Sequence, residues 1–179
     1  MMTSSITDIL QAAVEAPKTE MMTQEVIIQK EACVDNLIFN MVSLASYLYQ
    51  LNTQAHLLHL NIECPEFLAL HKFLKKQYEQ HTTDFDTVSE LVRSMDYLMP
   101  MCQNGLINAY KKFPNTKTYE AKESLVAYIK NLENGGMLSK AVVQMARQVE
   151  APDVENYVAE ILNNMFKSAW MLKATLRNA

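Results

Sequence analysis

The feature that most restricts the fold of this chain is its scarcity of helix-breaking residues. Only 3 Gly and 5 Pro occur among 179 residues, of which 49% are hydrophobic. Apolar side chains recur at spacings of three, four and seven residues, which is the pattern of an amphipathic helix. This periodicity predicts an all-α protein, with Thr23 as the first N-cap and long helices at about 24–60, 65–95, 118–149 and 153–177.

The link between the second and third of these helices indicates how the helices are arranged. It covers residues 96–117 and contains Pro100 and Pro114 around a predicted short helix near 103–111. A connection of this length suits a crossover along the molecule better than a tight hairpin. Four long helices with one long crossover predict a ferritin-like four-helix bundle.

The domain organisation follows from the same pattern. Residues 23–179 are expected to form one bundle domain, and residues 1–22, whose short apolar piece ends at Pro17, to form an N-terminal arm. Gly135 and Gly136 fall inside the third long helix and are expected to kink or split it.

The charge and the cysteines argue against several classes of protein. A net charge of −4 and a pI near 5.6 do not suit a chain that binds nucleic acid by its overall charge. Cys33, Cys64 and Cys102 form no CxxC pair, which is typical of reduced intracellular thiols. The most apolar stretch, about 16 residues long with polar interruptions, is too short to span a membrane. With no secretory signal visible, we expect a soluble, cytoplasmic protein.

Four residues between positions 59 and 90 are candidate metal ligands: His59, His71, Asp86 and Glu90. Imidazole nitrogen and carboxylate oxygen together can bind iron, zinc or manganese. Asp86 lies 15 residues beyond His71, which is about 22 Å along an unbroken helix. Either these groups never meet, or a second, antiparallel copy of the helix brings its acids to the histidines of the first. The second alternative predicts a metal site shared across a two-fold interface.

The stretch around these residues resembles the Dps family of mini-ferritins, in which it begins H-W-N-x-x-G-P. The residues of this chain that align with the family stretch are His59, Leu60, Asn61, Cys64, Pro65, Phe67, Leu70, His71, Lys75, Asp86 and Glu90. The segment AWMLKA, from Ala169 to Ala174, is similar to the W-M-L-R-A ending of the family. The similarity covers residues 24–177 in helix order and is most specific between positions 59 and 90.

This resemblance implies a homododecameric hollow shell that oxidises ferrous iron and stores the ferric mineral. It implies a catalytic metal site in which His59 and His71 of one chain meet Asp86 and Glu90 of a two-fold mate. Iron would be the bound metal, and zinc or another divalent ion could occupy the same site.

Three departures from the family pattern bear on this site. Lys75 replaces an aspartate, Leu60 a tryptophan and Cys64 a glycine. A cation at position 75 repels metal and removes a bridging carboxylate. His56, one turn before His59, either supplies a compensating nitrogen ligand or packs as a neutral partner against Lys75.

The function predicted is therefore that of a ferroxidase and iron store that protects against iron and peroxide stress. The alternative is a shell with a silent or mononuclear metal site, which Lys75 favours. A helical scaffold without metal would require the match at 59–90 to be accidental.

Two further predictions concern residues outside the metal site. The N-terminal 22 residues carry Lys18 alone against Asp8, Glu15 and Glu20, which argues against DNA binding through a basic tail. His81 lies on the apolar stripe and is predicted to be structural.

Overall fold

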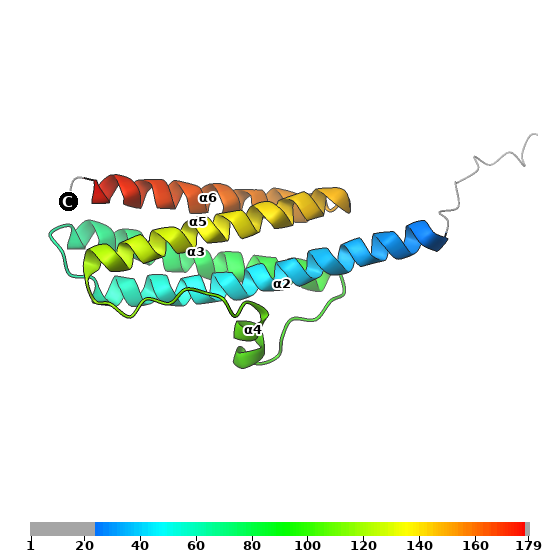
Figure 1. Ribbon diagram of the computed structural model, residues 1–179, viewed down its shortest axis with the longest axis horizontal. Coiled ribbons are helices and arrows are strands. Elements are labelled where there is room, and N and C mark those ends of the chain that lie inside the picture. The colour runs from blue at the N-terminus through cyan, green and yellow to red at the C-terminus, as the bar shows by residue number, and fades with distance from the viewer. Residues whose placement is uncertain (1–23, 178–179) are drawn as a thin grey trace, which may run out of the picture. The chain divides into compact units, whose positions relative to one another are not determined.

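The computed structural model describes residues 24–177, and every regular element in that range is a helix. They are α2 (Gln24–Asn61), α3 (Phe67–Ser94), α4 (Gln103–Ala109), α5 (Ala121–Gln148) and α6 (Pro152–Leu176) (Figure 1). The all-α prediction is confirmed, and each helix boundary falls within a few residues of its expected place. The predicted N-terminal arm and the Thr23 cap lie outside the described residues. None of the described helices is both long and apolar enough to cross a membrane.

Chain contacts separate residues 1–32 from residues 33–179, and the second unit contains the bundle. Within it, α2 and α3 are antiparallel neighbours, since their contacts run in opposite order along the two helices: His59 with His71, Asn52 with Tyr78 and Tyr49 with Phe85. α5 and α6 form a second antiparallel pair, joined by an ion pair between Lys173 and Glu133. The Tyr47 hydroxyl of α2 donates to the Asn131 carbonyl of α5 at 2.7 Å, which ties the two pairs together.

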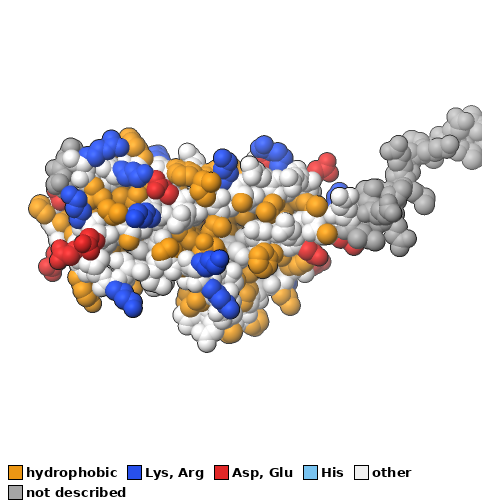
Figure 2. Space-filling model, in the orientation of Figure 1, with side chains coloured by type: hydrophobic (Ala, Val, Ile, Leu, Met, Phe, Trp, Pro, Cys, Tyr) orange, Lys and Arg blue, Asp and Glu red, His pale blue; other side chains and the backbone are white. Residues whose placement is uncertain are grey.

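The core lies between these four helices and follows the predicted apolar stripes. Its fully buried side chains include Leu37, Met41, Leu44, Leu48, Leu74, Val88, Val92, Leu132, Val154 and Val158. Burial of each such side chain contributes about 1.5–3 kcal/mol. Several large apolar side chains remain exposed on a single chain, among them Phe39, Leu60, Leu68, Met101 and Trp170. Figure 2 shows hydrophobic side chains gathered between basic ones on the face that it presents.

The crossover carries α4 and runs back along the bundle, as Figure 1 shows. Polar side chains of α2 hold it in place: Ser43 Oγ donates to the Ala109 carbonyl at 3.3 Å and Gln50 Nε2 to the Tyr110 carbonyl at 2.9 Å. The rings of Tyr110 and Phe113 each contact Tyr47 at a centroid distance of 5.0 Å. The crossover predicted from the long link is therefore present, together with its short helix.

The expectation that Gly135 and Gly136 split the third long helix is wrong, because α5 is continuous from Ala121 to Gln148. Both glycines are buried where helices approach closely. A Cβ at Gly135 would lie 2.7 Å from Met165 Sδ and 3.0 Å from a ring carbon of Tyr47. The missing side chain allows this close approach, and packing on both sides maintains the helix.

We predict that Gly135→Ala lowers the stability of the protein although alanine favours the helix. Overpacking costs about 1–3 kcal/mol against a propensity gain of about 1 kcal/mol. Gly136→Ala is the matched control, since its Cβ would meet the ring of Phe166, which is 39% exposed and can move outward. Melting temperatures at one protein concentration should fall for Gly135→Ala only. An equal rise for both variants would contradict this account.

Candidate metal centre

His59 and His71 face each other at the corner between α2 and α3. His59 lies in the last turn of α2 and His71 in the second turn of α3, and the turn between the helices closes with a Phe67 N–H to Cys64 carbonyl bond of 3.0 Å. The two imidazole rings stack with centroids 3.7 Å apart and planes 23° from parallel. His59 is buried and His71 is half-buried. Two of the predicted ligands are thus already together within one chain.

Each of these rings is oriented by the backbone of the other helix. His59 Nδ1 lies 2.8 Å from the His71 carbonyl oxygen, and His71 Nδ1 lies 2.9 Å from the His59 carbonyl oxygen. A carbonyl oxygen can only accept, so each Nδ1 must carry the proton. In the neutral ring, Nε2 then holds a free lone pair. Metal-binding histidines usually have this arrangement, with one ring nitrogen donating to a carbonyl or carboxylate and the other bound to the metal.

Aromatic side chains surround the histidine pair. The Phe67 ring centroid lies 5.1 Å from that of His71, and the Tyr78 centroid lies 5.4 Å from that of His59. His56 is exposed and stacks on Tyr78 at 4.3 Å, with its own centroid 6.1 Å from that of His59. His56 therefore has a packing role, but against Tyr78. Its role as a third nitrogen ligand stays a prediction.

Lys75 lies one turn after His71 on α3 and forms an ion pair with Glu79. Its Nζ is 3.7 Å from Glu79 Oε1, and the two side chains are 57% and 54% exposed. A pair this exposed contributes little to stability. The ammonium group of Lys75 is thus paired with Glu79, apart from the two histidines. Lys75 nevertheless lies on the same side of α3 as His71.

Asp86 and Glu90 are not brought to the histidines by their own chain. α3 is unbroken from Phe67 to Ser94, so the axial separation of about 22 Å between His71 and Asp86 holds. Both carboxylates are exposed. Within residues 24–177, no three His, Cys, Asp or Glu side chains are close enough to hold one metal ion. A complete site made from the four candidates therefore needs a second chain.

His81 is structural, as predicted from its place on the apolar stripe. It is buried, and its Nε2 lies 2.9 Å from the Tyr128 hydroxyl. Burial lowers the pKa of its imidazole to about 3, so the ring is neutral at physiological pH.

The sequence analysis misses Asp84, a buried carboxyl one turn further along α3. Gln80 Nε2 donates to its Oδ1 at 2.9 Å and the Tyr157 hydroxyl of α6 at 3.2 Å, while burial raises its pKa. Its position, three residues after His81 and four before Val88 on the apolar stripe, is the signal that could have found it.

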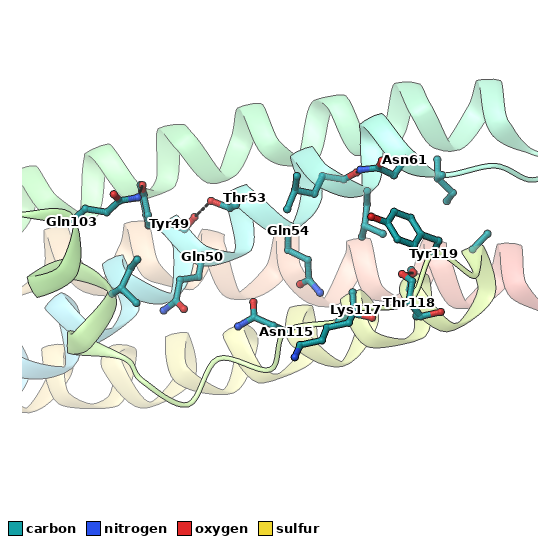
Figure 3. A pocket seen from close by; sticks show the side chains of 17 residues that line it. Tyr49, Gln50, Thr53, Gln54, Asn61, Gln103, Asn115, Lys117, Thr118 and Tyr119 are labelled. Carbon is teal, nitrogen blue, oxygen red and sulfur yellow. Dashed lines mark hydrogen bonds between the residues drawn. The ribbon is translucent and has the colours of Figure 1, made fainter.

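A cavity of about 470 Å³ lies away from the histidine pair, between α2, α4 and the crossover (Figure 3). Its lining contains amides and hydroxyls with one cation, Lys117, and neither a carboxylate nor a histidine. Figure 3 shows the Gln54 amide directed toward the crossover. Its buried Nε2 has no hydrogen-bond partner among the described residues. This chemistry does not suit a metal ion, so the histidine corner remains the candidate metal centre.

The four-helix topology and the crossover define the class of ferritin-like bundles. A model of the ferritin family, described as a ferritin-like domain, matches residues 40–179. The chain therefore belongs to the ferritin family. A comparison with curated proteins found no match.

Solved structures agree with this assignment at the level of the fold. The Dps of Thermosynechococcus elongatus superposes with a TM-score of 0.78 at 14% identity, covering 83% of this chain and 94% of its own. The Vibrio cholerae O1 protein, a member of a broad superfamily of ferritin-like diiron-carboxylate proteins, gives 0.74 at 16% identity, covering 81% and 91%. The zinc-soaked Dps of Listeria innocua gives 0.74 at 14% identity, covering 78% and 95%. The ferritin-like four-helix bundle predicted from the four long helices and the crossover is confirmed.

Proposed function

We propose that this chain is a Dps-like mini-ferritin that binds and oxidises ferrous iron at a site shared between two chains. The ferric product would be stored inside a hollow shell, protecting the cytoplasm against iron and peroxide. The observation that carries this proposal is the reciprocal bonding of His59 and His71, which leaves both Nε2 atoms available to a metal. Among the alternatives, a scaffold without metal gives no reason for two histidines to be held in this way.

The residues would have distinct roles. His59 and His71 of one chain would supply nitrogen ligands, and Glu90 of the mate a bridging or terminal carboxylate. Asp86 of the mate would bind the metal or orient a ligand. The exposure of Asp86 and Glu90 on an unbroken α3 supports a metal site shared between two chains, because an antiparallel mate can reach both carboxylates. Oxidation balances when two ferrous ions each give one electron to hydrogen peroxide, which takes up two protons and leaves as two waters.

A second candidate function is a protective shell whose metal site is mononuclear or silent. Lys75 favours it, since the residue lies on the side of α3 that carries His71 and, among the described residues, its ammonium group is paired with an exposed glutamate alone. Zinc or another divalent ion could bind such a site without being oxidised. The diiron description of the Vibrio cholerae relative and the zinc soak of the Listeria innocua protein are compatible with either function.

We predict that the protein purifies as a large closed assembly, most simply a dodecamer. Twelve chains of 20.5 kDa give a mass of roughly 250 kDa. The ligand set can be completed only between chains, and the exposed apolar side chains in Figure 2 offer surfaces for contact. Light scattering at micromolar concentration measures the mass. A monomer under these conditions would remove the basis of the shared site.

The function itself is tested by ferrous oxidation in the presence of peroxide or oxygen. Wild-type protein should oxidise iron faster than the uncatalysed reaction and retain it in the assembled fraction. Oxidation no faster than the background, with tight binding of zinc, would favour the second candidate. We expect no retardation of DNA, given the acidic balance of residues 1–22.

A further inference from the structure

A groove of about 460 Å³ runs between α3 and α6, away from the candidate metal centre. Of its α3 residues, Lys76, Gln80 and Asp84 lie about 140° to 220° around the helix axis from His71, and Lys72 lies about 100° from it. Asp86 and Glu90 lie within about 100° of His71. A mate that covers the histidine side would therefore leave accessible the part of the groove that Lys76, Gln80 and Asp84 line.

Three lysines line this groove: Lys72 and Lys76 on α3, and Lys167 on α6. All three are exposed, and none forms an ion pair with an acid in the described part of the chain. Lys72 and Lys76 are i,i+4 neighbours, an arrangement that is unfavourable for like charges until an anion lies between them. Asp84 is the single carboxyl in the lining, so the groove has a net charge of at least about +2.

The groove also contains buried polar groups without partners. Ser168 is 8% exposed, and its hydroxyl takes part in no hydrogen bond within residues 24–177. His81 is 3% exposed, and its Nδ1 has no partner there either. The Asn164 amide adds a further uncommitted donor at the same place. Of these atoms His81 Nδ1 is the fully buried one, and buried polar groups are almost always hydrogen-bonded, so an unpartnered nitrogen in the lining of a cationic groove points to a polar ligand.

We propose that the α3–α6 groove is a binding site for a phosphate group. Phosphate carries about −1.5 to −2 charges at pH 7, which matches the lining better than the single charge of a carboxylate. The three ammonium groups would contact its oxygens, and Ser168 and Asn164 would donate to them. Asp84 is outnumbered by the three lysines, and its Oδ1 accepts from Gln80 and Tyr157.

Calorimetric titration of the metal-free, assembled protein with inorganic phosphate tests the site independently of any iron chemistry. We expect saturable binding that weakens with salt, and the same titration with AMP shows whether a phosphate ester also fits. The double variant Lys76→Gln/Lys167→Gln should lose at least about tenfold in affinity. Lys140→Gln, which removes an exposed lysine of α5 outside the groove, should bind as wild type.

Ser168→Ala separates a built site from general surface charge, because it removes a donor and leaves every charge in place. We expect a loss of about threefold to tenfold in phosphate affinity. The proposal is overturned if neither phosphate nor AMP binds, or if the lysine variants weaken binding while Ser168→Ala does not. Binding of duplex DNA without binding of phosphate or AMP would also overturn it, and would assign the lysines to a nucleic-acid backbone.

Discussion

Hybrid shells assembled from His59→Ala and Glu90→Ala chains should recover iron oxidation that neither variant has alone. Each single variant removes one of the few ligands, so we expect specific metal affinity to fall at least about a hundredfold. In a hybrid, a site that takes its histidines from the Glu90→Ala chain and its acids from the His59→Ala chain is intact. Random pairing leaves about one quarter of the sites intact. Recovery would show that the His59 and the Glu90 of one site come from different chains, since neither variant chain carries both residues.

The matched control for this experiment is a hybrid of His59→Ala with His71→Ala. Both histidines of a site come from one chain, so no pairing of these two variants gives an intact site. Coexpression of each pair, followed by ferrous oxidation and zinc titration, gives the measurement, with light scattering to show equal assembly. Equal recovery in both hybrids, or no recovery in the first despite normal assembly, would contradict a shared site.

Lys75→Asp should increase the number of ferrous ions bound per site from one to two and speed up oxidation. An ammonium group about 4 Å from a divalent ion is unfavourable by about 8 kcal/mol at an effective dielectric constant of 20. In the structure, Lys75 Nζ lies 3.7 Å from Glu79 Oε1, and Lys75 lies one turn after His71 on the same side of α3. Removing the charge and adding a carboxylate should therefore permit a second metal.

Lys75→Gln distinguishes the two contributions, because it removes the charge without adding a ligand. We expect it to bind the first metal more tightly than wild type and to gain little of the second. Calorimetric titration with ferrous ion under anaerobic conditions gives the stoichiometry, and the rate with peroxide gives the activity. Two tightly bound ions per wild-type site would contradict the mononuclear prediction and would indicate His56 as the compensating ligand.

The long helices and the crossover are predictable from sequence because apolar period, proline positions and link length are local properties of the chain. The outcome at Gly135 is not local. Whether a glycine breaks a helix depends on Met165 and Tyr47 across the interface, and neither is near it in sequence. The sequence predicts that His59 and His71 are candidate nitrogen ligands. It does not predict how their rings are oriented, because the acceptors that orient both rings are backbone carbonyls, which every residue has.

The acid pair shows a different limit of sequence reasoning. Spacing along an unbroken α3 establishes that Asp86 and His71 of one chain cannot meet, and the structure agrees. The spacing along α3 does not establish where a second chain lies, since the position of that chain depends on surfaces formed by several helices. Asp84 illustrates the converse case. Its burial could have been read from the stripe, but its bond to Tyr157 joins residues 73 positions apart.

The crossed bonds between His59 and His71 also determine what the loss of one ring does to the other. Each Nδ1 is tethered to main-chain oxygen, so an alanine at either position leaves the surviving imidazole with its own anchor. Either imidazole can therefore be removed without breaking the hydrogen bond that orients the other. Both anchors depend on the alignment of α2 against α3, and a slip of either helix would misdirect both rings at once. Metal affinity at the two histidines would therefore fall when α2 and α3 shift relative to each other, and its measurement would report their alignment.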